Sequence, residues 1–435
     1  MSKDPSMLQT AAGLMTTQGI DSNLVFSNDE INILRNLAQK VRNYSERPIE
    51  TEKKKLWTLH NDLNGGRPLI FIDPENGWNE IITQDQIKCI NPLARVWEMH
   101  LRKEIFWAEG MKDDKVILPD FYVPYSYNDT GWGLMETVMY SEGAEDGAFI
   151  YDSPIKDYTN DFPQLKFPEI IVDYKKTEQI LDLAHSIFDG ILDVHLRGIW
   201  WWSLGMTWDF IKLRGLTNFM MDMYDHPDDI HALMGFLRDG FLRKLDFLEE
   251  NGLLGDNTGG SYVGSGGFGW TTQLPAENFN PEKVRTKDMW GFAESQETVG
   301  IAPEMFEEFI FPYQFDILKR FGLNCYGCCE PIDPRWEIVK RFPNLRRVST
   351  SPWANREKMK EYLGRDYIMS LKPMPTPLAM KVMDEEDVRK TVRSDLNITK
   401  GCNVEYIMKD NHTLGKNPWN ATRWVEIVRE EIDRL

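Results

Sequence analysis

Three of the five cysteines in this chain of 435 residues lie within the segment Gly322-Leu-Asn-Cys-Tyr-Gly-Cys-Cys-Glu330. Thiolates, together with nearby carboxylates or imidazoles, are the ligands that zinc prefers. The spacing of Cys325, Cys328 and Cys329 allows at least two thiols to reach one ion. Buried inert cysteines and a disulfide are the alternatives. The clustering favours a metal site, with zinc as the ion.

The cysteines follow a short apolar segment that predicts a strand ending in a turn. In an extended chain, Cys328 and Glu330 would point to one side and Cys329 to the other. Pro331 has no amide hydrogen for a strand ladder and therefore favours a turn here. The set of side chains that meets at one ion depends on that turn.

From Arg67 onward, short apolar segments alternate with amphipathic helical segments. Such repeats predict a parallel sheet, and about eight of them in a chain of this length favour an α/β fold of the closed (β/α)₈, or TIM-barrel, type. Residues 1–65 predict a helical N-terminal extension, and residues 66–435 the barrel that carries the site. The expected strands are Pro68–Ile72, Ile199–Leu204, Ser261–Val263, Met289–Ala293, Leu323–Tyr326, Arg346–Ser349, Tyr367–Leu371 and Val404–Met408.

Active sites of such barrels lie at the C-terminal ends of the strands, and this rule selects further candidates. Glu294 follows one expected strand and His412 lies just beyond the last, so both could meet the cysteine cluster. A hydrogen-bonded structural role is the alternative for each. Cys402 precedes the last strand and is excluded. The expected catalytic residues are Glu294, Cys328, Glu330 and His412, and the expected metal ligands come from Cys328, Cys329, Glu330, Glu294 and His412.

Aromatic side chains near the same strand ends are candidates for a substrate-binding wall. The glycine-rich segment Gly259–Trp270 lacks the motifs of a phosphate-binding loop, and we expect it to form either a mobile lid or a plain flexible linker. In the tryptophan run Trp200–Trp202, core packing is the default role and a ligand-facing ring the alternative. The candidate substrate-binding residues are Trp290, Phe292, Tyr262 and Trp202.

The composition excludes several classes of partner. The formal net charge of −18 repels phosphate backbones, so we expect no nucleic-acid partner. Apolar runs fall short of the length that spans a membrane, and no secretion-signal pattern precedes them, so we expect a soluble, cytoplasmic protein. The sequence leaves a homodimer open.

The segments Gly215–Met234 and Ala302–Tyr313, with the strand end at Cys328, resemble the uroporphyrinogen decarboxylase superfamily. The similarity covers most of the chain from Arg67. Decarboxylases of this superfamily carry an arginine-rich N-terminal signature that grips the carboxylates of the substrate. The corresponding segment Arg67–Trp78 contains acids and no further arginine, so we expect that uroporphyrinogen is not a substrate.

A second branch of this superfamily comprises zinc-dependent methyltransferases that work with corrinoid proteins. They typically carry His-x-Cys at one strand end and a further Cys at the last strand. The corresponding positions here are Cys328, with Glu330 or Cys329, and His412. Relatives that demethylate aromatic ethers also use carboxylate ligands, which keeps Glu294 in the set.

The resemblance implies transfer of a methyl group from a small O-methyl compound, with an aryl methyl ether as first choice, to the cobalt of a cobalamin-type corrinoid on a separate protein. Zinc would make the leaving oxygen less basic. The alternatives are a methylcorrinoid-to-thiol or methylcorrinoid-to-tetrahydrofolate methyltransferase, and a zinc- or corrinoid-binding protein without catalysis.

Overall fold

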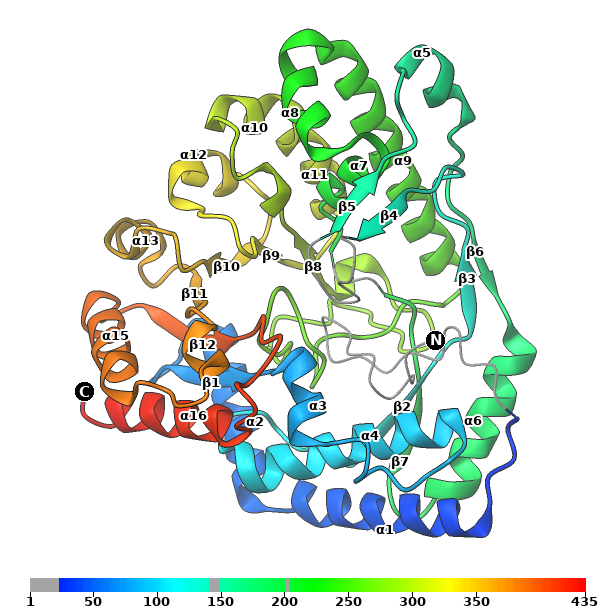
Figure 1. The fold of residues 1–435 in the computed structure, drawn as a ribbon, viewed down its shortest axis with the longest axis vertical. Helices are drawn as coiled ribbons and strands as arrows, with labels where there is room; N and C mark the ends of the chain where they lie inside the picture. The colour runs from blue at the N-terminus through cyan, green and yellow to red at the C-terminus, as the bar shows by residue number, and fades with distance from the viewer. Residues whose placement is uncertain (1–22, 141–148, 201–202) are drawn as a thin grey trace.

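A computed structural model describes residues 23–140, 149–200 and 203–435 (Figure 1). Its centre is a six-stranded parallel sheet in the order β1-β12-β11-β10-β9-β8. These strands are β1 (Leu69–Ile72), β8 (Trp290–Ala293), β9 (Leu323–Tyr326), β10 (Leu345–Thr350), β11 (Ile368–Leu371) and β12 (Asn403–Met408).

Three two-stranded sheets complete the strand pairing. The parallel pair is β2 (Asp120–Pro124) with β7 (Asp193–Arg197), and the antiparallel pairs are β3 (Tyr127–Asp129) with β6 (Ile170–Val172) and β4 (Thr137–Tyr140) with β5 (Phe149–Asp152). The prediction of an α/β fold with a parallel sheet is therefore confirmed. Within the described residues, the hydrogen-bonded strands do not form one closed sheet.

Six of the expected strands agree with the structure to within one or two residues, and every residue of these observed strands except Arg346 of β10 is buried. Two expectations were wrong. Of the strand expected at Ile199–Leu204, the described residues 199–200 and 203–204 form no strand, while β7 ends earlier, at Arg197; Trp202 lies outside the described residues. The segment Ser261–Val263 forms only an isolated bridge, between Tyr262 and Phe268.

The N-terminal extension contains α1 (Asn28–Ser45) and α2 (Pro48–Asn61). Ser27 begins α1 with a capping box, in which its hydroxyl accepts from the Glu30 amide and the Glu30 carboxylate accepts from the Ser27 amide. Helix α1 packs against α4 (Pro92–Phe106) and α6 (Tyr174–Phe188).

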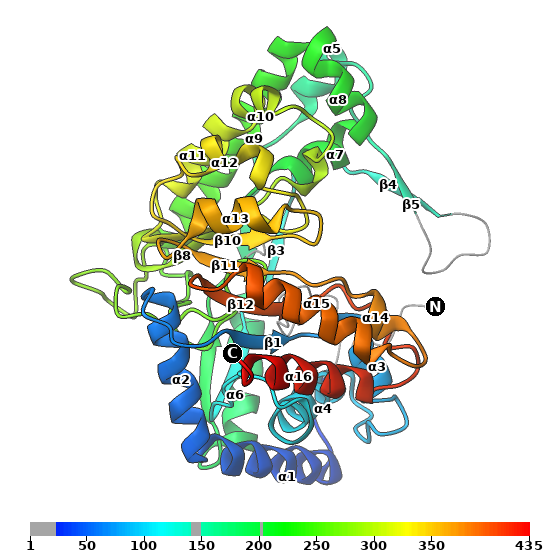
Figure 2. The same cartoon turned by 90° about the vertical axis from the view of Figure 1, so that its left-hand side faces the viewer.

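The remaining helices lie outside the parallel sheet (Figures 1 and 2). The helical stretch of residues 303–318 divides at Ile310, because Pro312 cannot donate a helical hydrogen bond. No helix among the described residues is long and apolar enough to cross a membrane. The helices other than α1, α2, α4 and α6 are α3 (Trp78–Ile81), α5 (Tyr158–Asp161), α7 (Thr207–Arg214), α8 (Leu216–Asp225), α9 (Pro227–Glu250), α10 (Pro303–Phe309), α11 (Phe311–Leu318), α12 (Trp336–Val339), α13 (Arg356–Leu363), α14 (Thr376–Ala379), α15 (Glu385–Ile398) and α16 (Trp419–Ile432).

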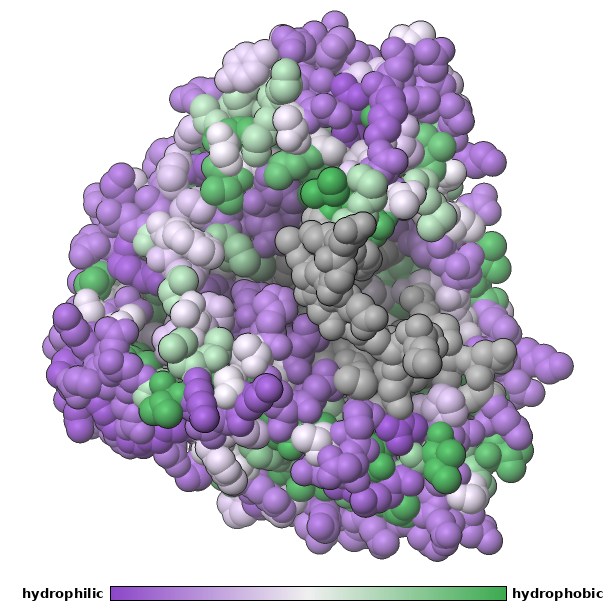
Figure 3. Space-filling model, viewed as in Figure 1, coloured by the Kyte–Doolittle hydropathy of each residue, from purple (hydrophilic) through white to green (hydrophobic). Residues whose placement is uncertain are grey.

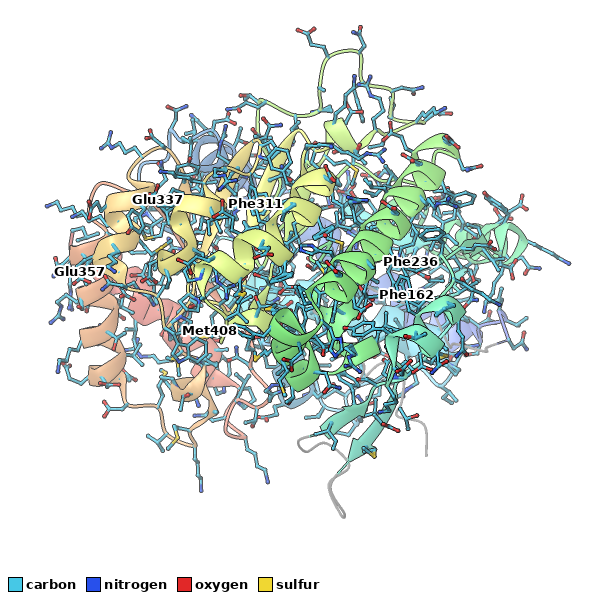
Figure 4. All side chains as sticks on the ribbon, turned by 90° about the horizontal axis from the view of Figure 1, so that it is seen from above. Phe162, Phe236, Phe311, Glu337, Glu357 and Met408 are labelled. Carbon is cyan, nitrogen blue, oxygen red and sulfur yellow. The ribbon has the colours of Figure 1, made fainter. Side chains whose placement is uncertain are left out.

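Helix α9 is anchored by aromatic contacts on its outer side. Phe236 stacks on Phe167, with ring centroids 4.4 Å apart, and meets Phe162 edge to face at 5.7 Å (Figure 4). These contacts hold the segment between α5 and β6 against the helix.

The glycine-rich segment Gly259–Trp270, hereafter the glycine loop, is packed inside the molecule. A Cβ placed on Gly264 would lie 2.8 Å from the Cys325 Cβ, and one on Gly266 would lie 2.1 Å from the Ile407 Cγ2. The Asn61 amide donates to the carbonyl oxygens of Phe268 (2.7 Å) and Trp270 (2.7 Å). The expectation of a mobile lid or flexible linker was therefore wrong, because the glycines serve close approach to β9 and β12.

Candidate functional site

The candidate site lies where β8 and β9 end, at one edge of the parallel sheet. Gly327 follows β9 with φ +89°, and this conformation turns the chain before Pro331 is reached. The turn brings Cys328 and Cys329 side by side, with their Sγ atoms 3.7 Å apart. The two thiols therefore lie together and half-buried at the strand end.

Two buried carboxylates belong to the same site. Glu330 accepts from the Ser295 amide (2.8 Å) and from the Cys328 amide (2.8 Å). Glu294, which follows β8, accepts from the Ser203 hydroxyl (3.0 Å) and from the Gln296 amide (2.9 Å). These hydrogen bonds fix both carboxylates, and each oxygen keeps a further lone pair.

The acidic groups of this cluster repel one another. Burial, with the charges of Glu297 and Glu330, raises the pKa of Glu294 well above its usual range. Burial also raises the pKa of Glu330. The contact with Cys329, burial and the two carboxylates raise the pKa of the Cys328 thiol. A cation placed among these groups would favour their ionised forms.

His412 and Asp410 occupy places that the sequence did not predict. His412 is exposed, and its Nδ1 lies 3.4 Å from the Asn76 Nδ2. Asp410 has φ +60°, and its Oδ2 lies 4.0 Å from the Cys329 Sγ. The structure thus brings together Cys328, Cys329, Glu294 and Glu330, while His412 faces Asn76 and Asp410 approaches the cysteines.

The donor set suits zinc in its chemistry, since thiols and carboxylates are zinc ligands. Among the residues that the structure describes, no three His, Cys, Asp or Glu side chains are arranged as ligands of one ion. Cys325 contributes nothing at the strand ends, because its Sγ lies 3.6 Å from the Arg347 Nη1 in the interior. Binding of one ion by three of these groups would require their side chains to rearrange.

Three of the aromatic candidates can be placed. Trp290 is buried, and its Nε1 donates to the Gly269 carbonyl (3.0 Å). Phe292 is also buried, and it belongs with Trp290 to one small apolar cluster. Tyr262 contacts Phe71, with ring centroids 5.7 Å apart, and borders a pocket. Of the three, Tyr262 is the one placed to meet a ligand.

Two lysines that follow strands were missed as site residues. Lys372 follows β11 and donates to the Ser370 hydroxyl (2.9 Å). Burial lowers the pKa of Lys372 to about 8, although the charges of Glu405 and Cys328 act in the opposite direction. Lys409 follows β12 and pairs with Glu75 at 3.1 Å. Position after a strand was the signal that could have selected both.

No protein-family model and no curated protein matches this chain. The likeness to the uroporphyrinogen decarboxylase superfamily therefore stays a prediction.

Proposed function

We propose that the protein is a zinc-dependent methyltransferase of the uroporphyrinogen decarboxylase superfamily, which moves a methyl group from an aryl methyl ether to the cobalt of a separate corrinoid protein. The observation that carries the proposal is the pair of thiols 3.7 Å apart, at a strand end that also holds the buried carboxylates of Glu294 and Glu330. Thiols and carboxylates are both zinc ligands, and carboxylates and thiols with raised pKa values often belong to functional sites.

The proposal includes a closed barrel. In such a barrel, the six strands of the main sheet and the separate parallel pair β2–β7 would together be the eight strands. Two backbone hydrogen bonds support closure at the open edges. The Asp114 amide donates to the Ile70 carbonyl (2.8 Å) beside β1, and the Leu204 amide donates to the Phe292 carbonyl (3.0 Å) beside β8.

Within this site, Cys328 and Cys329 would hold zinc with Glu294 or Glu330, and a bound zinc would supply a Lewis acid that polarises the ether oxygen. The hydrogen bonds from Ser295 and Ser203 orient the two carboxylates. Lys372 interacts electrostatically with Cys328. Its positive charge would stabilise the negative charge that develops on the departing phenolate.

The methyl group must face a surface that a corrinoid protein can reach. Exposed apolar side chains follow four of the strands on the side of the site: Val299 after β8, Trp353 after β10, Met374 after β11 and Trp419 after β12. Figure 3 shows separate apolar patches on a largely hydrophilic surface. Apolar side chains around the strand ends suit the docking of a protein partner.

We expect the unchanged protein to contain about one zinc per chain. Replacing Cys328 with Ser is expected to remove this zinc, because a zinc site loses affinity for the ion when one of its thiolate ligands is removed. The measurement is elemental analysis of the purified protein. Cys402→Ser is the matched control, since Cys402 lies next to the opposite end of β12. Full metal content in the Cys328 variant would contradict the assignment.

Mixing the protein with a reduced corrinoid protein is expected to convert the cobalt spectrum to the methylated form when a methoxyarene is added. Methylamines, methanol and glycine betaine are tested in the same way. Methylation from amines alone would refute the substrate class, although aromatic boxes also bind methylammonium groups. No methylation from any donor would favour methyl transfer to a thiol or to tetrahydrofolate, or a binding protein without catalysis.

A further inference from the structure

A pocket lies between β1, β2, β7 and the glycine loop. Tyr122 of β2 and Arg197 of β7 line it on one side, and Tyr262 of the glycine loop lines it on another. Five aromatic rings border the space: Phe71, Trp107, Tyr122, Tyr262 and Phe268. The walls therefore suit a flat, apolar ring.

The acidic side chains of this pocket have partners. Their contacts are Glu104 with Lys115 (2.6 Å), Asp120 with His195 (3.0 Å), and Asp73 with the Trp78 Nε1 (2.8 Å). Each acidic group in the wall of the pocket therefore has a hydrogen-bonding or ion-pair partner within the protein.

Arg197 differs from these groups. Its guanidinium carbon lies 4.9 Å from the centroid of the Tyr122 ring. Among the residues that the structure describes, no carboxylate lies within ion-pair distance of this guanidinium. Burial lowers the pKa of Arg197 and Tyr122 opposes that shift, but an arginine stays charged in proteins. A positive charge without a counter-ion thus faces a pocket of aromatic rings.

Arg197 also lies close in sequence to a residue that contacts the candidate site. Arg197 ends β7, and Ser203, six residues further on, donates to the Glu294 carboxylate (3.0 Å). The Leu204 amide then pairs with the Phe292 carbonyl of β8. Arg197 and the residue that donates to Glu294 are therefore close along the chain.

We propose that this pocket binds an aromatic carboxylate, whose two oxygens pair with the Arg197 guanidinium while the ring packs against the aromatic walls. Binding of an aromatic carboxylate does not depend on the proposed function. Only the further step, that this carboxylate is a methoxyarene and serves as the methyl donor, rests on the proposed function. Arg197 selects the acid over neutral arenes of the same shape.

The test is a calorimetric titration of the full chain, without a corrinoid protein, with benzoate, 4-methoxybenzoate and the neutral 4-methoxybenzamide. The protein is expected to bind the acid at least about tenfold more tightly than the amide, as a charge-assisted bidentate contact requires. Arg197→Gln is expected to remove this preference and leave binding of the amide unchanged, and Arg197→Lys to restore it in part.

Arg243→Gln is the matched control, because Arg243 also lies over a ring, that of Phe167 at 4.2 Å, but on α9 away from the pocket. Equal binding of acid and amide by the unchanged protein would overturn the inference, whatever the stability of the variants. So would a folded Arg197→Gln protein that keeps the preference, or displacement of benzoate by an equal concentration of inorganic phosphate. Acid binding without any cobalt methylation would leave the pocket assignment intact and refute the proposed reaction alone.

Discussion

Gly266→Ala is expected to lower the free energy of unfolding by roughly 2–6 kcal/mol, the sum of an overpacking cost and a strained backbone conformation. The added Cβ would lie 2.1 Å from the Ile407 Cγ2, and Gly266 has φ +142°, which side chains rarely adopt. Ile407 belongs to the central sheet and is fully buried, so it has little room to move. Urea unfolding, followed by circular dichroism, measures the loss.

Gly259→Ala is the matched control within the same glycine loop. A Cβ at Gly259 meets no atom within 4 Å, and we expect a change of at most about 1 kcal/mol. Equal stability of the two variants would show that the glycine loop is not packed against β12 in solution.

Glu405→Gln is expected to cost about 3–5 kcal/mol, because it leaves the buried charge of Arg347 without its partner. The Glu405 Oε1 lies 3.0 Å from the Arg347 Nε, and its Oε2 lies 3.2 Å from the His60 Nε2. All three side chains are almost completely buried. The double variant Glu405→Gln/Arg347→Met is expected to recover part of the loss, since it removes the unpaired charge.

The same interaction makes stability depend on pH. Burial alone would raise the pKa of Glu405, but the charge of Arg347 and the contact with His60 outweigh it and lower the pKa to about 2. A carboxyl with a lowered native pKa contributes its full stability above its unfolded value of about 4.5, and this contribution is lost as the pH falls toward 2.

Unfolding curves between pH 6 and pH 2 test this prediction. The unchanged protein is expected to lose stability more steeply below about pH 4.5 than Glu405→Gln does. Glu385→Gln is the control, because the Glu385–Arg423 pair is exposed and worth about 1 kcal/mol or less. Parallel curves for the unchanged protein and Glu405→Gln would contradict the assigned role of Glu405.

The sequence predicted the main sheet because most of its strands are rich in apolar residues, and strands buried on both faces read as such short runs. Strands β2 and β7 were not predicted because neither is a continuous apolar run. Buried and half-buried residues alternate along β2, no residue of β7 is fully buried, and charged residues such as Asp120 and Arg197 belong to these strands. The glycine loop was misread because glycine serves both flexible linkers and close packing, and composition alone does not separate these uses.

Within the site, the adjacency of Cys328 and Cys329 along the chain and the placement of Glu294 after a strand were enough to predict a cluster. The partner from the last strand could not be predicted. Asp410 has a positive φ, which redirects the following residues, so that His412 meets Asn76 instead of the cysteines.

Helix α2 has a consequence for the way the chain can be divided. Its last turn supplies His60 to Glu405, and Asn61 both to the glycine loop and to Arg347, at 2.7 Å from the Arg347 Nη2. Cutting the chain after this helix would not release an independent barrel and a dispensable tail. Each fragment would lose buried contacts with the other. The two fragments would therefore have to associate before either regained its native structure.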